Sequence, residues 1–340
     1  MRAGTILEKR NSKAILENQE EVKMEEEDMK ILVYGAGVLG SYLAHELYKG
    51  ENKVTLLARG KHYEAIKKNG MVINHIRQKQ ETIDKINVVN ELKPEDEYDM
   101  IFVVVQKSQL KNVLPIVAQN TKCQTVIWVG NNMTAKQTYR EFMSLSQTKP
   151  NVLFGFLSCG GHREDNIVYN WHGSTCEMTL GGIKGVQVNK ELFKKAFKGT
   201  CLQAEFRPDM NAWLKYHGAL ITPICLAIEY EKGETKRIHH FKALRLSVKA
   251  VKEAIAMYEK MGYLKDAPHD MKFFQWPTSI ISYLMAWFLP TKTGHLIAID
   301  HAMAAQSEIA ELSQEILSFS KTYNQSLPAF KELCLLCNLK

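Results

Sequence analysis

A glycine-rich turn between two apolar strands most constrains how this chain folds. Residues 30–50, "KILVYGAGVLGSYLAHELYKG", indicate a short strand, a turn and a helix, and residues 52–58, "NKVTLLA", indicate the next strand. The turn itself, "GAGVLG", matches GxGxxG. The match alone is weak. Here, however, the strand before it, the helix after it and a second strand within about 30 residues form the βαβ context that the motif requires.

Each position of this turn has a physical task if it holds a dinucleotide. Gly35 permits the tight turn, Gly37 lets a pyrophosphate approach the backbone, and Gly40 allows the helix to pack closely on the strand. Val38 and Leu39 begin the helix, where free N–H groups and the positive end of the helix dipole favour an anion. The alternative is a glycine turn that binds no ligand. We expect a dinucleotide.

The end of the second strand indicates which dinucleotide. In NAD sites an Asp or Glu at this point usually holds the ribose 2′-hydroxyl. The sequence here is "LLARGK", which places Arg59 at the strand tip with Lys61 close by and no acid. A guanidinium suits a phosphate because it donates two parallel hydrogen bonds. We therefore predict that Arg59 holds a 2′-phosphate and that the cofactor is NADPH; the alternative is a solvated loop arginine.

The rest of the first half alternates apolar strands with helices. "YDMIFVVVQK" (98–107) and "QTVIWVGN" (124–131) are continuous apolar runs, typical of parallel strands buried on both faces. Helical segments separate them, which is typical of a doubly wound α/β sheet of the Rossmann type. Between about 150 and 185 the β formers and glycines indicate strands that finish this sheet, and from 187 onward the pattern is helical. We expect a disordered extension, a cofactor-binding sheet domain and an all-helical domain, at residues 1–28, 29–186 and 187–340.

Composition excludes several other classes of function. The net charge of +7 is mild for 340 residues, and no basic run indicates nucleic-acid binding. Seven scattered cysteines indicate a reducing, cytoplasmic setting, and no set of ligands indicates a metal. The longest apolar stretch, "SIISYLMAWFL" (279–289), is too short to span a bilayer, so we expect a buried helix and no membrane insertion.

Three further segments occur in the order seen in ketopantoate reductases: "VVVQKSQL", "GNNM" and "DMNAWLKYHGALITP". With the glycine turn, they make residues 29 to 330 or so resemble that family. The resemblance implies a two-domain fold like that of 6-phosphogluconate dehydrogenase. It also implies that Lys215 is the catalytic proton donor, that Asn131 lies near nicotinamide and substrate, and that Lys107 lies near the cofactor and the substrate's carboxylate.

The chain also departs from the family pattern. The family has a Glu in a "TEID"-like segment that holds the substrate's hydroxyl, and "LIAID" (296–300) would put Ala298 there. Two asparagines that follow the catalytic lysine in the family are missing. We expect Thr222, Asp300 and Lys107 to bind the substrate instead. The other side chains near these positions are His217, Gly218, Ala219, His295 and His301.

These observations predict an NADPH-dependent reductase of a 2-oxo acid, with ketopantoate (2-dehydropantoate, reduced to pantoate in pantothenate biosynthesis) as the reference substrate. The active site would lie in the cleft between the two domains. Two alternatives stay open: a reductase or dehydrogenase of another substrate, such as an opine-like compound, and a catalytically weak sensor of NADPH. The apolar helical domain is compatible with a homodimer.

Overall fold

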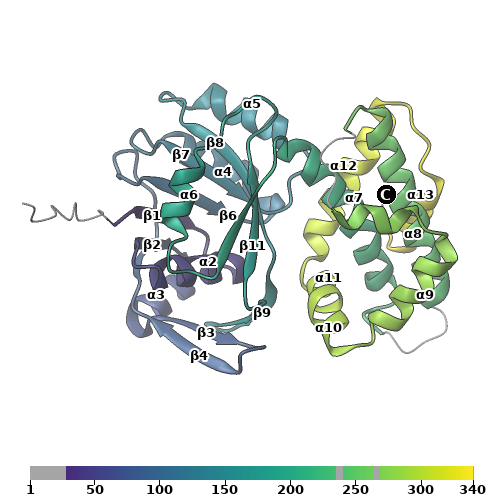
Figure 1. Ribbon diagram of the computed structural model, residues 1–340, viewed down its shortest axis with the longest axis horizontal. Helices are drawn as coiled ribbons and strands as arrows, with labels where there is room; N and C mark the ends of the chain where they lie inside the picture. The colour runs from purple at the N-terminus through teal and green to yellow at the C-terminus, as the bar shows by residue number, and fades with distance from the viewer. Residues whose placement is uncertain (1–27, 235–239, 264–268, 340) are drawn as a thin grey trace, which may run out of the picture.

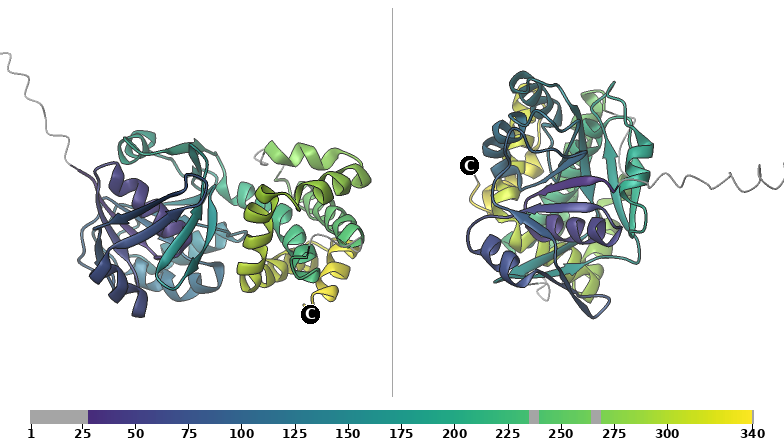
Figure 2. Two further views of the ribbon diagram at one scale, coloured as in Figure 1. Left: turned by 90° about the horizontal axis from the view of Figure 1, so that it is seen from below. Right: turned by 90° about the vertical axis from the view of Figure 1, so that its left-hand side faces the viewer.

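The computed structural model describes residues 28–234, 240–263 and 269–339. The expected disordered extension lies outside the described residues except for Asp28. The chain forms a sheet-containing part and a helical part, which lie side by side in Figure 1 and in the left view of Figure 2. This is the mixed α/β architecture predicted from the sequence.

The main sheet contains the alternating apolar strands. From β8 to β5 each neighbouring pair runs parallel, whereas β11 pairs antiparallel with β8. The strand order changes direction at β1, which lies between β2 and β6, and such a point is where open α/β sheets bind ligands. In spatial order the strands are β12 (Leu202–Phe206), β11 (Cys176–Gly181), β8 (Asn151–Leu157), β7 (Thr125–Val129), β6 (Met100–Val104), β1 (Lys30–Tyr34), β2 (Lys53–Leu57) and β5 (Asn87–Val89).

Helices connect most of these strands. The first, which begins directly after the glycine turn, carries no acidic residue in its first turn. The third starts at Lys107, at the carboxyl end of the buried strand β6. The helices of this part are α2 (Val38–Lys49), α3 (Gly60–Asn69), α4 (Lys107–Ala118), α5 (Ala135–Leu145) and α6 (Lys190–Ala196).

Two features of the sheets differ from the prediction. Residues 150–185 do not all finish the main sheet, because β9 (Gly160–Glu164) and β10 (Ile167–Trp171) form a second, four-stranded sheet with β3 (Met71–His75) and β4 (Gln80–Asp84). In addition, β12 pairs with β11 in the main sheet. The expected boundary after residue 186 therefore falls inside the sheet-containing part, and the continuous helical region starts with α7 (Met210–Tyr230).

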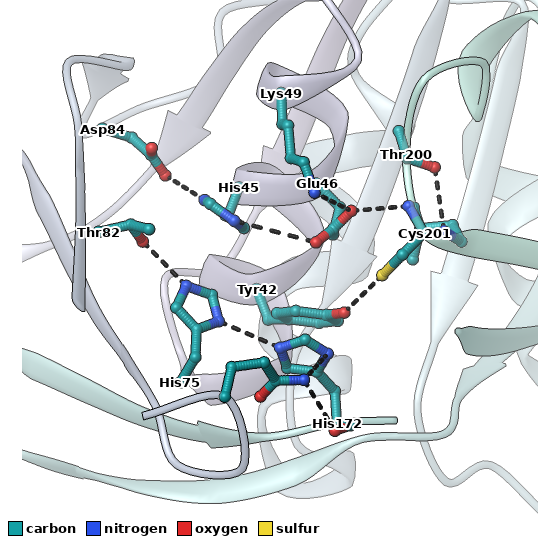
Figure 3. A network of polar contacts seen from close by, with 12 residues as sticks. Tyr42, His45, Glu46, Lys49, His75, Thr82, Asp84, His172, Thr200 and Cys201 are labelled. Carbon is teal, nitrogen blue, oxygen red and sulfur yellow. Dashed lines mark hydrogen bonds and ion pairs between the residues drawn. The ribbon is translucent and has the colours of Figure 1, made fainter. Parts of the chain in front are cut away.

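A buried polar network joins the second sheet to α2 (Figure 3). His45 Nδ1 on α2 lies 2.8 Å from Asp84 Oδ2 on β4. His75 Nδ1 on β3 lies 3.1 Å from His172 Nε2, just after β10. The Tyr42 hydroxyl on α2 lies 3.0 Å from the Cys201 sulfur. The glycine turn lies directly before α2. The network therefore holds the middle of this helix, at Tyr42 and His45, against the rest of the sheet-containing part.

The helical part is built around α7 and α8, which pack against each other, with α13 against both. The helix α8 ends at Lys260, shortly before Gly262, which has a φ of +84°. After α7 the elements are α8 (His240–Lys260), the 3-10 helix η1 (His269–Gln275), α9 (Thr278–Phe288), α10 (Lys292–Gly294), the π-helix η2 (His295–Ile299), α11 (Asp300–Ala304), α12 (Gln306–Thr322) and α13 (Pro328–Leu336).

The expectation that residues 279–289 form a buried helix is wrong in one respect. The segment is the helix α9, but Tyr283 is 66% and Trp287 75% exposed. Its apolar residues surround the helix, and only one side of it packs on Val248, Val251 and the rest of the helical core. Across the described residues, none of the helices has the length and apolarity needed to cross a bilayer.

Candidate active site

The glycine turn has the geometry of a phosphate cradle. Gly35 has a φ of +119°, and a Cβ there would lie 2.2 Å from the carbonyl oxygen of Val104. A Cβ at Gly40 would lie 1.8 Å from the carbonyl oxygen of Gly35, so both positions require glycine. A Cβ at Gly37 would meet no described atom within 4 Å, and no side chain caps the start of α2. Gly35 and Gly40 therefore serve the fold, whereas Gly37 leaves open space beside the N–H groups of Val38 and Leu39.

Arg59 lies at the carboxyl end of β2, beside this turn. It precedes α3 and has no side-chain cap interaction. Its guanidinium is exposed, donates a hydrogen bond to the Tyr34 hydroxyl, and lies 5.5 Å from the centre of the Tyr34 ring. Tyr34 ends β1, so the guanidinium is placed between the ends of two adjacent strands. This is a suitable position for a phosphate on a ribose.

Lys215 is buried in the second turn of α7, with 3% of its surface exposed. The helix is started by Asp209, whose carboxylate accepts from the N–H groups of Asn211 and Ala212. Lys215 Nζ donates to the Met133 carbonyl oxygen at 2.5 Å and to Asn211 Oδ1 at 2.8 Å. Burial lowers the pKa of Lys215 to about 8. Since an ammonium has three N–H donors, one remains for a ligand.

Two aromatic rings complete the surroundings of this ammonium. The centres of the Tyr263 and Phe319 rings lie 5.0 and 5.2 Å from Lys215 Nζ. Their faces stabilise the charge without accepting a strong hydrogen bond. Gly218, one turn further along α7, faces Met133 so closely that a Cβ would lie 2.3 Å from the Met133 sulfur. The lysine is thus held where α7 meets the loop after β7.

Lys107 lies in the same region and contacts both parts of the chain. Its Nζ donates to Asn132 Oδ1 and Thr134 Oγ1, both at 2.7 Å, and lies 3.0 Å from Glu315 Oε1 on α12. Its own backbone N–H, at the start of α4, lies 3.4 Å from Glu308 Oε1. The sheet part and the helical part therefore meet at this lysine.

Asn131 and Glu308 form the centre of the contact. Asn131 follows β7 and is 9% exposed; its Nδ2 donates to Glu308 Oε2 at 3.2 Å, while its Oδ1 is buried with no partner among the described residues. Glu308 is 7% exposed, and burial raises the pKa of its carboxyl group. The N-terminus of α4 favours a carboxylate at this place.

Glu308 is the site residue that sequence reasoning missed. The prediction matched the family's "TEID" segment to "LIAID" and so placed Ala298 at the position of its glutamate. Ala298 lies in η2, whereas Ser307-Glu308-Ile309 also resembles the first three residues of that segment and brings a carboxylate onto Asn131 and Lys107. The assignment of Ala298 was therefore wrong. The available signal was the tripeptide "SEI", ten residues further along the chain.

The other predicted substrate-binding residues are less favoured by the structure. Thr222 is fully buried two turns after Lys215, and its hydroxyl has no partner in the described part of the chain. Asp300 is placed elsewhere: its carboxylate is 42% exposed and lies 3.9 Å from His295 Nδ1. No contact joins Asp300 to Lys107, Asn131 or Glu308 in the residues described, so the structure does not bring it into the cluster.

Known proteins resemble this chain in sequence and in fold. Residues 31–185 match the family described as "Ketopantoate reductase PanE/ApbA". The 2-dehydropantoate 2-reductase of Archaeoglobus fulgidus is 25% identical over 251 residues, which cover 72% of this chain and 78% of that protein. The sheet-containing part of the chain therefore matches the ketopantoate reductase family, and the longer alignments extend the similarity into the helical part. The corresponding enzyme of Pyrococcus horikoshii is also 25% identical, over 66% of this chain and 72% of its own, and that of Lactococcus lactis is 27% identical over only 40% of its own length.

Solved structures share the fold over most of the chain. A PanE/ApbA family ketopantoate reductase from Ralstonia eutropha has a TM-score of 0.69 at 15% identity and covers 92% of this chain and 98% of its own. A D-mandelate dehydrogenase solved with NADH and anilino(oxo)acetate has a TM-score of 0.67 at 17% identity, over 91% and 97% of the two chains. The family is one of oxidoreductases, and this likeness at low identity shows the fold.

Proposed function

We propose that this protein is an NADPH-dependent reductase of a 2-oxo acid, with Lys215 as the proton donor to the ketone oxygen. The observation that carries the proposal is the buried ammonium of Lys215, held by Met133 and Asn211 with one N–H left for a ligand. The match to the ketopantoate reductase family supports it, and ketopantoate is the first substrate to test. The mandelate dehydrogenase among the similar structures favours testing other 2-oxo acids as well, because mandelate is itself a 2-hydroxy acid.

The residues after β1 and β2 fit a dinucleotide cofactor. Gly37 leaves room for a pyrophosphate, which the N–H groups of Val38 and Leu39 would bind, and Arg59 would hold a 2′-phosphate. When bound, a dihydronicotinamide supplies a hydride to the ketone carbon. The absence of an acid at the end of β2 favours NADPH over NADH. Because the related mandelate dehydrogenase holds NADH, the preference has to be measured.

Lys215 supports the reaction by neutralising charge on the substrate oxygen. As hydride reaches the ketone carbon, negative charge develops on the oxygen, and an ammonium that donates a hydrogen bond there lowers the barrier. The same group then transfers its proton to the oxygen. A pKa of about 8 leaves Lys215 protonated at neutral pH and makes it a stronger acid than an ordinary lysine, which suits a general acid.

Asn131 and Glu308 would orient the substrate and nicotinamide beside Lys215. The unpartnered Oδ1 of Asn131 can accept from a ligand N–H or O–H group, and Glu308 fixes the amide by accepting from its Nδ2. We assign to Glu308 the role that the family's glutamate has, which is to accept a hydrogen bond from a substrate hydroxyl. Thr222 stays a predicted substrate contact, whereas Asp300 is dropped from the proposal.

The test is NADPH oxidation by the purified protein with a panel of 2-oxo acids, comparing the wild type with Lys215→Gln. Ketopantoate, branched 2-oxo acids, aryl 2-oxo acids and neutral ketones form the panel, and each assay is repeated with NADH. We expect turnover of at least one 2-oxo acid, and a kcat that falls by about 10²- to 10⁴-fold in Lys215→Gln while the Kd for NADPH is retained. NADPH binding without turnover of any 2-oxo acid would instead favour the alternative that the protein is a catalytically weak sensor of NADPH.

A further inference from the structure

The ammonium of Lys107 has no hydrogen left for a substrate in this structure. Its three N–H donors are directed to three acceptors: Asn132 Oδ1 at 2.7 Å, Thr134 Oγ1 at 2.7 Å and Glu315 Oε1 at 3.0 Å. Lys215 differs, because two of its three donors are used. If Lys107 binds a substrate's carboxylate, one of its present partners has to leave.

Glu315 is the partner that comes from the other part of the chain. Asn132 and Thr134 lie in the loop after β7, and Asn132 is held there by the Thr138 hydroxyl at 3.0 Å from its Nδ2. Glu315 lies on α12, and its Oε1 also accepts from the Thr134 hydroxyl at 3.0 Å. The two ion-paired side chains are only 12% and 16% exposed, so water screens the pair weakly.

Only one of the two carboxylate oxygens of Glu315 accepts hydrogen bonds from the described residues. Its Oε2 is buried and has no hydrogen-bond partner in the described residues. A buried carboxylate oxygen without a donor is costly, so Glu315 is held there chiefly by its single oxygen on Lys107 and Thr134. Replacement by another carboxylate would keep the charge on Lys107 balanced and would free Glu315 to reach solvent.

We propose that Glu315 occupies the anion site of Lys107 in the ligand-free protein and that the carboxylate of a 2-oxo acid displaces it. The inference rests on the proposed function, since it concerns the same cleft. It makes Glu315 a specificity-determining residue: a neutral ketone, ester or amide cannot replace a carboxylate on Lys107, whereas an acid can. The exchange also weakens affinity for acids, because each one competes with an internal carboxylate.

The exchange couples substrate binding to the contact between the two parts. With Glu315 released, the direct link from Lys107 to α12 is limited to the backbone N–H that faces Glu308. α12 can then adjust around the substrate, while Lys107 stays fixed to the loop after β7 by Asn132 and Thr134.

The test measures the affinity of oxamate, a non-reducible 2-oxo acid analogue, for the full-length protein saturated with NADPH. Isothermal titration compares the wild type with Glu315→Gln and with the matched control Glu311→Gln. Glu311 lies one turn earlier on the same helix, is exposed, and carries the same charge in the field of Lys107. We expect oxamate to bind Glu315→Gln about tenfold more tightly than the wild type. Its Kd for Glu311→Gln should differ from that of the wild type by less than about twofold.

A second variant keeps the test informative if Glu315→Gln folds poorly. Glu315→Asp retains the charge but shortens the side chain by one methylene, so we expect an oxamate affinity between those of the wild type and Glu315→Gln. Unchanged or weaker binding in both variants would overturn the inference, and so would an equal gain in Glu311→Gln. Because binding is measured without turnover, tighter oxamate binding in a protein that reduces no 2-oxo acid would support the exchange while contradicting the proposed reductase.

Discussion

The side-chain amide of Asn131 donates to the Glu308 carboxylate across 3.2 Å and joins the end of β7 to the first turn of α12. The glycine turn and Arg59 belong to the sheet part, whereas Lys215 and Glu308 belong to the helical part. The proposed hydride-donor site and the proposed proton donor are therefore on different parts of the chain. Their alignment depends on a few buried polar contacts, which include this one and the hydrogen bond from Lys215 Nζ to the Met133 carbonyl oxygen.

Removing Glu308 should slow the reaction more than changing its charge. Glu308→Ala leaves the Asn131 amide without its acceptor and removes the group that would accept from a substrate hydroxyl. We expect kcat/KM for the best 2-oxo acid to fall by about 10²-fold. Glu308→Gln keeps an acceptor for Asn131 and should lose less. Steady-state kinetics at saturating NADPH distinguish the two, and equal losses would argue against the role given to this hydrogen bond.

Replacing Arg59 should alter cofactor choice. Arg59→Gln removes the guanidinium proposed to bind the 2′-phosphate, so the Kd for NADPH should rise about 10- to 100-fold while that for NADH stays within about twofold. Fluorescence titration with both cofactors provides the measurement. Lys61→Gln, at an exposed neighbouring position, is the control and should have a smaller effect. If the Kd values for NADPH and NADH rise by the same factor, Arg59 does not bind the 2′-phosphate.

The rate should fall as the pH rises through about 8. Burial lowers the pKa of Lys215 to about that value, and only the protonated amine can donate a proton. In a plot of kcat against pH the alkaline limb should therefore report this group. Lys215→Arg, which stays protonated, should move the limb to higher pH even though it is slower. An alkaline limb that is unchanged in Lys215→Arg would belong to another group.

The histidine network should make the protein sensitive to acid. Burial, with the nearby His45 and His172, lowers the pKa of His75 to about 4. The unfolded chain therefore binds more protons than the folded one between about pH 6.5 and 4, and stability present above pH 6.5 is lost as the pH falls through that window. We expect His75→Gln to reduce this loss by about 2 kcal/mol, measured by urea unfolding at pH 7 and pH 4.5. A pH dependence equal to that of the wild type would exclude His75 as its source.

The main sheet was predictable because its strands carry their own signals. β6 and β7 are apolar along their whole length, and the glycine turn fixes the order strand, turn, helix. The second sheet was not, because β3 and β4 are partly polar, and β3 pairs with β10 almost a hundred residues away. Such pairing depends on tertiary packing rather than on local pattern.

The candidate site was predictable to the extent that its residues follow strand ends or match family motifs. Lys107, Asn131 and Lys215 meet at one place, as the resemblance implied. Glu308 was missed because two short segments of the chain resemble the same motif, and only the fold shows which one reaches Asn131. Glu315 matches no motif, and its contact with Lys107 could not be inferred without the packing of α12 on α4.

The central claim is that hydride passes from NADPH to the carbonyl carbon of a 2-oxo acid while Lys215 protonates the oxygen. The most direct measurement uses NADPH deuterated at C4 of the nicotinamide, with ketopantoate and the best acid of the panel, and locates the label in the product by mass spectrometry and NMR. The account predicts deuterium on carbon 2 of a 2-hydroxy acid, formed at least about 10²-fold more slowly by Lys215→Gln with NADPH binding retained. A product without the label, or equal rates in the two proteins, would contradict it.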